Sequence, residues 1–464
     1  MPGLPSEMRR RPQLGLFDTI SLAVGIVVGV AIFKVPAGVF RNVADPWHGL
    51  AAWLAGGALS FIGALCFAEL AAAYPRSGGQ YVFLSRAFGP WMGFLFGWAQ
   101  LVAIITGTIG AMAYVFADYA VRFFSISPNY SAVLAVAAIV GLTAMNLLGV
   151  VVGKTMQNIL TVAKVIGLGG IVAAGLFGGG IAPAPTVSVP PNGPGIGLAM
   201  ILILYAYGGW SDVAYVAAET RQRRRNIPLA LLIGVGVVTL LYLAINVAYL
   251  AGLGFAGLQT SAAPAADVLS ASFGPIGGKA MSLLVMISAL GAINGMIFAG
   301  ARVYAALGAD HRLFALLNRW SPRFETPVWS LGTQGIVATA LVTAVGTATA
   351  RTGLDSALGM VGLDSLPWHQ YGGGFETLVA GTAPVFWLFF LLTGLALFVL
   401  RWREPTRRRP FRVPLNPVVP VIFCGMCLYM LYAAVVYAGA LALLGIVPLG
   451  LGVPLYLISR AVRR

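Results

Sequence analysis

Charged residues are scarce in this chain of 464 residues. Only 9% are Asp, Glu, Lys or Arg, whereas an ordinary soluble domain has about 25%. So few charges could not cover a soluble surface of this size, and a net charge of +15 built from so few residues does not indicate nucleic-acid binding. Hydrophobic residues make up 59% of the chain, and its mean hydropathy is +0.88. We therefore predict an integral membrane protein with many crossings.

Cysteine is also scarce, and the three cysteines exclude a disulfide framework. Cys424 and Cys427 have the CxxC spacing of redox and zinc sites, but they lie in an apolar run without a second pair or a nearby histidine. We interpret them as small core residues of a membrane helix. The sequence has no nucleophile–base–acid set and no P-loop. No enzyme activity, cofactor or metal site is predicted.

Long apolar segments, by contrast, recur along the whole chain. A helix needs about 20 apolar residues to cross the hydrocarbon layer of a membrane. Twelve segments of this kind are predicted, at 17-41, 50-73, 91-121, 131-151, 155-177, 196-219, 227-252, 277-307, 327-348, 375-401, 415-438 and 441-459. If the N-terminus is inside, 23 of the 29 Lys and Arg lie on the cytoplasmic side, as the positive-inside rule requires. Both termini are therefore predicted to be cytoplasmic.

Two of these segments are interrupted at corresponding places. Gly25, Gly29 and Pro36 interrupt the first segment, and Gly208 with Gly209 interrupts the sixth. Irregular backbone at membrane depth is tolerated where it lines a cavity. Breaks at matching positions of two halves indicate an inverted-repeat transporter with its site at the midplane. The alternative is that these glycines only allow close packing of helices.

The predicted fold is accordingly all-α, with 12 transmembrane helices in a 5+5 inverted repeat whose helices 1 and 6 are broken. The repeats are expected at 17-177 and 196-401, and helices 11-12 at 415-459. Residues 1-16 are the predicted cytoplasmic N-terminus, and 460-464 the cytoplasmic tail. The membrane is predicted to be the plasma (inner) membrane.

Broken helices expose main-chain groups that can bind a ligand. The freed N–H groups suit a carboxylate, and the freed carbonyls suit an ammonium, so together they favour a zwitterion. The freed N–H groups are expected near Gly29, Val30 and Ala31. The freed carbonyls are expected near Tyr205, Ala206 and Tyr207.

Several motifs resemble those of one transporter superfamily. They are Gly29-Val-Ala-Ile-Phe33, the segment from Phe67 to Tyr81, Tyr205-Ala-Tyr-Gly-Gly-Trp210, Asn226-Ile-Pro228, and Asn294-Gly with Ala301-Arg302. Over about residues 15-405 the chain resembles the amino acid–polyamine–organocation (APC) superfamily, in its L-type amino acid transporter-like branch with the LeuT-type fold. Taken together these motifs are specific, although each alone is weak.

The resemblance implies a substrate site at the two breaks. It assigns substrate binding to Val27, Gly29, Val30, Ala31, Tyr205, Ala206, Tyr207, Gly208 and Trp210. Tyr205 matches the aromatic gate of the family, whereas Trp210 is either a pocket wall or a packing wedge. Val30 and Ala31 depart from the family, which has Ser or Thr and then Gly at these positions. The lost hydroxyl and the added methyl group indicate a modest pocket.

Lys164 is the most informative charged residue. It follows Lys154 by ten residues, which is about 15 Å along a helix and near the midplane, where a lysine is costly and points to function. It resembles the fifth-segment lysine of sodium-independent members of the superfamily, whose ammonium takes the place of a bound sodium ion. This implies a coupling or gating role. The alternative is a static cation held by backbone carbonyls.

Further candidates for coupling or gating are Asp212, Glu69, Glu219 and Arg302. Asp212 follows the second break, where it either binds an amine or a proton or else stabilises the start of the second half-helix. Glu69 and Glu219 are predicted at inner ends of their segments, as inner-gate ion pairs or as solvated interface charges. The arginines expected near them are Arg76, Arg221 and Arg302.

The predicted function is secondary active transport of amino acids by alternating access, independent of sodium, through proton symport or exchange. The predicted partners are the small-molecule substrate, membrane lipid and, for symport, protons; the sequence leaves any oligomer or accessory subunit open. One alternative is a polyamine or cationic amine carrier that uses Asp212. A second is an ion channel or energy-transducing subunit, which would carry a longer relay of midplane charges. A major-facilitator transporter would need a long central loop, whereas 220-226 is short.

Overall fold

The protein is described here from a computed structural model. The described residues are 13–76, 78–177, 196–261, 263–360, 362, 364–368 and 374–461. Residues 1–12 and 462–464, which hold most of the predicted cytoplasmic termini, lie outside them. Over the described ranges the regular structure is helical, and one isolated bridge pairs Leu14 with Thr220. The predicted all-α fold is therefore confirmed.

The first half of the chain contains a broken helix followed by four long helical segments. Its elements are α1 (Leu16–Val27), α2 (Ala31–Phe40), α3 (Pro46–Ala73), α4 (Gln80–Phe88), α5 (Pro90–Ala99), η2 (Gln100–Ile104), α6 (Ile105–Phe124), η3 (Pro128–Tyr130), α7 (Ser131–Leu147) and α8 (Val150–Phe177). Of these, α5, η2 and α6 run on as one span, and η2 is a short π-helix within it.

The second half repeats this order and adds two helices. Its elements are α9 (Ile196–Ala206), η4 (Trp210–Val216), α10 (Arg223–Thr260), α11 (Pro264–Phe273), α12 (Pro275–Asp310), η5 (Arg312–Asn318), α13 (Val328–Gly346), α14 (Ala348–Met360) and α15 (Gly374–Arg403). The two added helices, α16 (Val418–Ala438) and α17 (Leu443–Ala461), are joined by the turn η6 (Gly439–Ala442).

The order of elements reveals the internal repeat. Each half begins with an interrupted helix, α1–α2 in one and α9–η4 in the other. A long helix and then a short helix follow in both halves, α3 with α4 and α10 with α11. The pattern is that of an inverted-repeat transporter.

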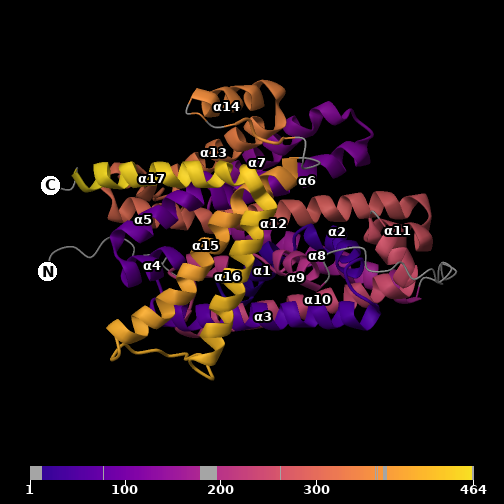
Figure 1. Ribbon diagram of the computed structural model, residues 1–464, viewed down its shortest axis with the longest axis horizontal. Helices are drawn as coiled ribbons and strands as arrows, with labels where there is room; N and C mark the ends of the chain where they lie inside the picture. The colour runs from indigo at the N-terminus through magenta and orange to yellow at the C-terminus, as the bar shows by residue number, and fades with distance from the viewer. Residues whose placement is uncertain are drawn as a thin grey trace.

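Ten stretches of the described residues are long and apolar enough to cross a membrane. One of them, Val418–Ala461, has 44 residues and so about twice the length that one crossing needs. It contains both α16 and α17, which run in different directions in Figure 1. The pair α1–α2 is a further, broken crossing, so the helices agree with the twelve predicted segments.

The start and the end of the described chain lie at the same end of the molecule. Near the start, the backbone of Leu14 pairs with that of Glu219 and Arg221, just before α10. Near the end, Ser459 of α17 is 3.2 Å from the imidazole of His311, at the end of α12. An ion pair between Glu219 and Arg302 of α12 ties these two regions together.

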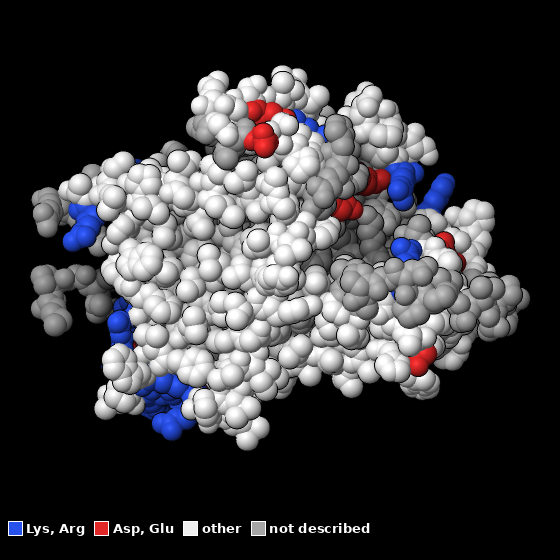
Figure 2. All heavy atoms as spheres, in the orientation of Figure 1, with Lys and Arg blue, Asp and Glu red and all other residues white. Residues whose placement is uncertain are grey.

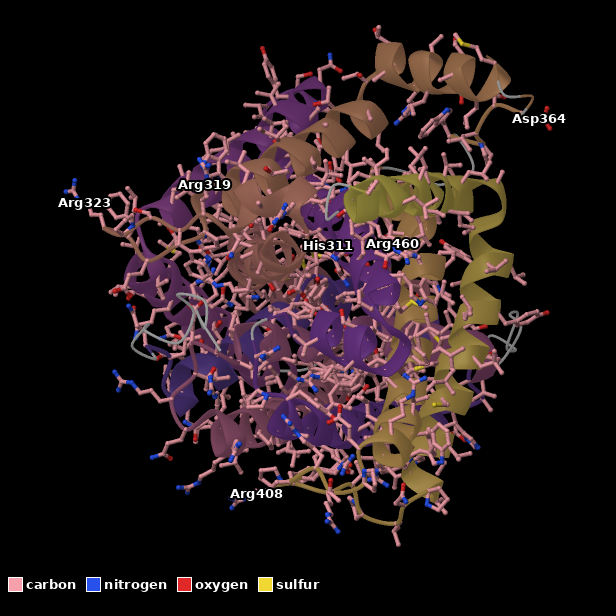
Figure 3. The ribbon with its side chains drawn as sticks, turned by 90° about the vertical axis from the view of Figure 1, so that its left-hand side faces the viewer. His311, Arg319, Arg323, Asp364, Arg408 and Arg460 are labelled. Carbon is pink, nitrogen blue, oxygen red and sulfur yellow. The ribbon has the colours of Figure 1, made fainter. Side chains whose placement is uncertain are left out.

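Charged side chains are distributed as a membrane protein requires. On the face drawn in Figure 2 they gather at the ends of the molecule and around α14, and a broad uncharged surface lies between. Figure 3 looks onto the end that holds His311. The labelled arginines spread across that end are Arg319, Arg323, Arg408 and Arg460.

Local chemistry explains where key helices begin and how closely they pack. Asp45 caps α3, because its carboxylate accepts the His48 N–H at 2.9 Å and Pro46 occupies the first helical position. Its hydrogen bonds with His48 hold the pKa of Asp45 below its ordinary value. Where α1 meets α8, a Cβ at Gly25 would collide with the side chain of Gln157. Glycine therefore lets the first broken helix lie directly against α8.

Candidate functional site

The first break separates α1 from α2. The Gly29 N–H donates to the Val27 carbonyl at 2.7 Å, and the Phe33 N–H donates to the Val30 carbonyl at 3.1 Å. The helix α2 begins at Ala31, and the N–H groups of a first helical turn have no partner within the helix. The freed donors are therefore those of Ala31 and Ile32, because the Gly29 N–H, which the sequence placed among them, and the Phe33 N–H are used within the break.

The second break separates α9 from η4. The Gly208 N–H donates to the Tyr205 carbonyl at 3.1 Å. Gly209 has a φ of 103°, and a Cβ on it would come within 2.7 Å of a methyl group of Ile26. A residue with a side chain would be strained there in both respects. Because Ile26 belongs to α1, the two broken helices lie in contact at their interruptions.

A tyrosine of α10 connects the two breaks. The hydroxyl of Tyr242 is 3.1 Å from the Val27 carbonyl oxygen and 3.1 Å from the Ala206 carbonyl oxygen. Tyr242 is fully buried. Its one hydroxyl hydrogen lies within reach of both carbonyls, so Tyr242 bridges the two broken helices and fixes their spacing.

A cavity of about 130 Å³ lies between the two breaks. The two broken helices and the neighbouring helices α6, α12 and α15 contribute its walls. From the first broken helix these are Ile26, Val27, Gly29, Val30 and Ala31. From the second they are Leu204, Tyr205, Ala206, Gly208, Gly209, Asp212 and Tyr215. The cavity has the mainly apolar lining and few polar groups of a small-molecule site.

Most of the residues predicted to bind substrate line this cavity. Those that line it are Val27, Gly29, Val30, Ala31, Tyr205, Ala206 and Gly208. Tyr207 does not, because its side chain points toward α3, where its hydroxyl donates to the Trp53 carbonyl at 3.3 Å. Successive residues of a helix face different directions, so Tyr205 and Tyr207 cannot share one wall. The side chain of Tyr207 therefore lies outside the cavity lining, whereas its main-chain carbonyl, on which the prediction rested, stays a prediction.

Trp210 does not line the cavity either. Its ring packs 5.0 Å from the ring of Phe67 and 5.8 Å from that of Phe390. Of the two interpretations left open by the sequence, the structure supports the packing wedge. Trp210 holds η4 against α3 and α15.

The remaining walls were not predicted. They come from the π-helix η2, from α6, from α12 and from α15. The residues are Gln100, Ile104, Ile105, Thr108, Met112, Met296, Val379, Thr382, Ala383, Phe386 and Trp387. A π-turn within an α-helix is frequent at functional sites. Gln100 could have been singled out from the sequence, because it is a polar side chain within an apolar run.

Lys164 binds the end of the first half-helix. Its ammonium donates to the Gly25 carbonyl at 2.5 Å and to the Val28 carbonyl at 2.7 Å, and its side chain is fully buried. Among the described residues it has no ion pair with a carboxylate. A cation fits this place because the carbonyl end of a helix carries negative partial charge.

Helix α12 completes the surroundings of this lysine. The hydroxyl of Ser288 lies 3.1 Å from the Val28 and Gly29 carbonyl oxygens. A Cβ at Gly291 would come within 2.7 Å of the Lys164 side chain, so glycine makes room for it. Lys164 thus joins α8 to α1 beside α12, and it lies behind the break and outside the cavity lining.

Asp212 lies on the cavity wall. The hydroxyl of Ser211 donates to its carboxylate at 3.3 Å, and only 9% of Asp212 is exposed. The residue before η4 is Gly209, which has no side chain with which to cap it. Asp212 therefore places a carboxylate at the cavity and within the first turn of η4, so both functions considered from the sequence are compatible with its position.

A polar network continues from this wall. The hydroxyl of Tyr215 donates to the Gln80 side chain at 2.8 Å, and Gln80 donates to Thr393 at 2.9 Å. All three residues are buried. The network connects η4 to α4 and α15.

Glu219 and Arg302 form a buried ion pair. Two nitrogens of the guanidinium donate to the two carboxylate oxygens, at 2.9 and 3.0 Å. The exposed fractions are 1% for Arg302 and 9% for Glu219. The two residues are therefore a buried pair and not solvated interface charges. The guanidinium also stacks 3.9 Å from the ring centre of Phe298. This pair joins the segment after η4 to α12.

Glu69 is likewise buried but has other partners than expected. Arg401 donates to its two oxygens at 2.9 and 2.5 Å, Arg409 lies 3.4 Å away, and the Val413 N–H donates at 2.7 Å. Arg76, the arginine expected nearby, is exposed instead. Glu69 therefore anchors the basic segment after α15 against α3.

Broken helices that meet at a cavity inside a helical membrane protein define the class of secondary transporters. Among the described residues no group of three or more His, Cys, Asp or Glu could hold a metal ion. Residues 14–446 match the family of amino acid permeases, and the chain belongs to that family. It is thus a multi-pass membrane permease and not an enzyme.

Individual relatives are similar to this chain over most of their length. The b(0,+)-type amino acid transporter 1 of Homo sapiens is 31% identical over 443 residues, which cover 93% of this chain and 84% of that protein. The serine/threonine exchanger SteT of Bacillus subtilis (strain 168) is 28% identical, with 89% and 88% covered. The Asc-type amino acid transporter 1 of Homo sapiens is 26% identical, with 99% and 84% covered.

Proposed function

We propose that the protein is a secondary active transporter that carries small neutral amino acids by alternating access. The observation that carries this proposal is the cavity bounded by main-chain atoms of both broken helices. A transporter of this kind holds its substrate at such a place and opens it to the two sides in turn. The names of the relatives, which are amino acid transporters and a serine/threonine exchanger, support the same function.

The substrate carboxylate binds at the start of α2. There the main-chain N–H groups from Ala31 onward carry positive partial charge. The ammonium group binds toward the carbonyl side of the second break and Asp212. Apolar residues such as Ile104, Met112 and Phe386 face the substrate side chain, which favours a neutral amino acid. The methyl group of Ala31 limits its size.

Transport is independent of sodium in this proposal. The ammonium of Lys164 already binds the carbonyls at the end of α1, so a sodium ion is not needed to hold α1 against α8. The driving force is then either exchange for a second amino acid or proton symport. The name of the SteT relative favours exchange, whereas symport would require a titratable group such as Asp212 at the cavity.

Uptake of labelled amino acids into proteoliposomes tests this function. Vesicles preloaded with unlabelled amino acid should take up label faster than empty vesicles if the protein exchanges, and an imposed proton gradient should drive uptake into empty vesicles if it is a symporter. Strict dependence on a sodium gradient would overturn the proposed coupling. No uptake of any of the twenty amino acids under these gradients would overturn the function itself.

We also place the protein in the plasma (inner) membrane with both termini in the cytoplasm. The end that holds Ser459 and the Leu14 pairing carries the exposed arginines Arg319, Arg323 and Arg408, and cytoplasmic ends are rich in arginine. Cleavage of a C-terminal tag in sealed inside-out vesicles, but not in right-side-out vesicles, is the expected result. The reverse pattern would contradict this orientation.

A polyamine or cationic amine substrate is the second candidate, because Asp212 places a carboxylate on the cavity wall. Competition distinguishes the two proposals. If the protein carries neutral amino acids, excess serine should inhibit the uptake of labelled alanine and putrescine should not. If putrescine inhibits strongly and is itself transported, the amine carrier is the correct assignment.

A further inference from the structure

A second cavity lies directly behind the proposed substrate site. It has a volume of about 170 Å³, and its walls come from η2, α13, α14, α15 and α17. Thr382 of α15 lines both cavities. Within η2, Gln100 and Ile104 face the first cavity while Val102 and Ala103 face the second. The π-helix is therefore a thin wall between the two.

The lining of this second cavity is apolar. Thr382 is the one lining residue with a polar side chain, and its hydroxyl donates to the Leu378 carbonyl at 2.8 Å. Its donor is therefore used, and its hydroxyl oxygen is the one side-chain group of the lining that could accept from water. An apolar cavity of about 150 Å³ stays dry and takes up apolar guests. The apolar lining therefore favours a hydrocarbon ligand.

The cavity extends from the interior to the flank of the molecule. Ala103 and Leu378 at its inner end are buried. Leu341, Ala344 and Val447, on α13 and α17, are partly or more exposed, and Val447 is 40% exposed. These two helices are membrane-spanning, so we place the mouth of the cavity between their exposed lining residues, where it faces the lipid. A hydrocarbon chain can enter from the bilayer without crossing water.

A positively charged side chain lies next to one of the residues that line the second cavity. Arg351 of α14 donates to the carbonyl of Val345, a lining residue, at 2.6 Å, and its guanidinium lies 5.7 Å from the ring of Trp368. The nearby Asp355 accepts the Trp368 indole N–H and the Leu366 N–H, so that carboxylate is already bound. An arginine at this place suits the phosphate of a lipid headgroup.

From the apolar cavity, its lateral mouth and this arginine we infer that the protein binds one membrane phospholipid here. A segment of one acyl chain, about as large as a benzene ring, fills the cavity behind η2, and the headgroup phosphate lies at Arg351. The chain supports the π-helix and Thr382 from the side opposite the substrate. The site does not depend on the identity of the transported substrate.

Photo-crosslinking tests the site in the full-length protein. The protein is reconstituted in bilayers that contain a trace of phospholipid with a diazirine near the middle of one acyl chain, and labelled peptides are identified by mass spectrometry. Label is expected on the α13 segment around Ala344, the α17 segment around Val447 and η2. Because a phenyl ring fills the cavity, Ala344→Phe should lower this label about tenfold.

A matched control is available on the same helix. Ile336 of α13 is 72% exposed and does not line the cavity, so Ile336→Phe should leave the labelling unchanged. If Ala344→Phe does not give folded protein, Val447→Phe blocks the mouth from a position that is already exposed. Arg351→Gln should lower labelling by an anionic phospholipid, while Lys279→Gln, which removes a cation remote from the cavity, should not.

Three results would overturn the inference. The first is label spread evenly over exposed helices with none on η2, and the second is equal labelling of the wild type and the cavity-filling variants. The third is labelling by a free photoreactive fatty acid but not by the phospholipid, which would show that the occupant is not a phospholipid.

Discussion

The ammonium nitrogen of Lys164 lies 2.7 Å from the carbonyl oxygen of Val28, where α1 ends. The same nitrogen lies 2.5 Å from the Gly25 carbonyl oxygen. A buried lysine is thus bound by main-chain oxygens at the negative end of a half-helix. Because the neighbouring residues Gly29 and Val30 line the cavity, any change at Lys164 acts on the proposed substrate site through one turn of backbone.

Replacement of Lys164 by Ala is expected to lower uptake about tenfold or more, since the end of α1 loses the group that holds it. The variant should also unfold at a lower temperature, because two carbonyls lose their partner at a cost of about 1–3 kcal/mol each. Uptake in proteoliposomes and thermal unfolding in detergent measure the two effects. Lys279→Ala, at an exposed lysine, controls for loss of a charge.

Substrate binding separates a coupling role for Lys164 from a purely structural one. If the lysine acts in coupling, Lys164→Ala should still be stabilised against unfolding by the transported amino acid, although net uptake is lost. If the variant neither binds nor transports, the lysine is only structural. Normal uptake by Lys164→Ala would contradict both roles.

The ion pair of Glu219 and Arg302 gives a second prediction. Glu219→Gln leaves a guanidinium that is 1% exposed without its charged partner, and breaking a buried pair in this way costs about 3–5 kcal/mol. The double variant Glu219→Leu with Arg302→Met should regain most of that loss, because neither charge remains buried. Thermal unfolding of Glu219→Leu, Arg302→Met and the double variant measures this coupling.

Transport gives the complementary result for this pair. If the pair acts as the inner gate that the sequence predicts, the double variant should remain slow in uptake, because that interaction is gone. A double variant no more stable than either single variant would show that the two residues do not act as a pair. Full uptake by the double variant would show that the pair is not a gate.

The two helix breaks were predictable because glycine is conspicuous in an apolar run. Gly208 and Gly209 stand inside a segment of apolar residues, and a break at membrane depth needs a cavity. The charge of Lys164 was visible for the same reason. The helix breaks and Lys164 could be predicted because each depends on a glycine or a charged residue that stands out among apolar neighbours.

Other parts of the site could not be read from the sequence. Phe386 and Met112 are apolar residues in apolar helices, and a membrane sequence does not distinguish those that face a cavity from those that face lipid. The pair of Glu69 and Arg401 joins positions 332 residues apart, so only the packing of α3 against α15 brings them together. The sequence could not show whether Trp210 lines the cavity, because the 3-10 geometry of η4 changes which residues face inward.

Tyr242 offers a third prediction, because one hydroxyl serves both breaks. Tyr242→Phe removes the donor to the Val27 and Ala206 carbonyls and keeps the ring that packs on Trp53. The free energy of unfolding should fall by about 1 kcal/mol, and the KM for uptake should rise because the broken helices are less firmly spaced. Tyr249→Phe removes a hydroxyl at the Ile32 carbonyl instead, and its smaller effect on KM is the comparison. Unchanged stability and KM in Tyr242→Phe would contradict this role.

The size of the transported side chain should depend on Ala31. Its methyl group lies on the cavity wall beside the N–H groups proposed to bind the carboxylate, and Ala31→Gly removes that methyl group while keeping the donors. Leucine should then compete with labelled alanine about fourfold better than it does for the wild type, because the lost methyl group makes room for about one methylene group of leucine, which is worth about 0.8 kcal/mol. Ala37→Gly, in the same helix but outside the cavity lining, carries a similar cost of about 0.5–1 kcal/mol for glycine in a helix. It should leave the preference for alanine over leucine unchanged. An equal shift in both variants would assign the effect to the flexibility of α2, and no shift in either would show that Ala31 does not limit the substrate.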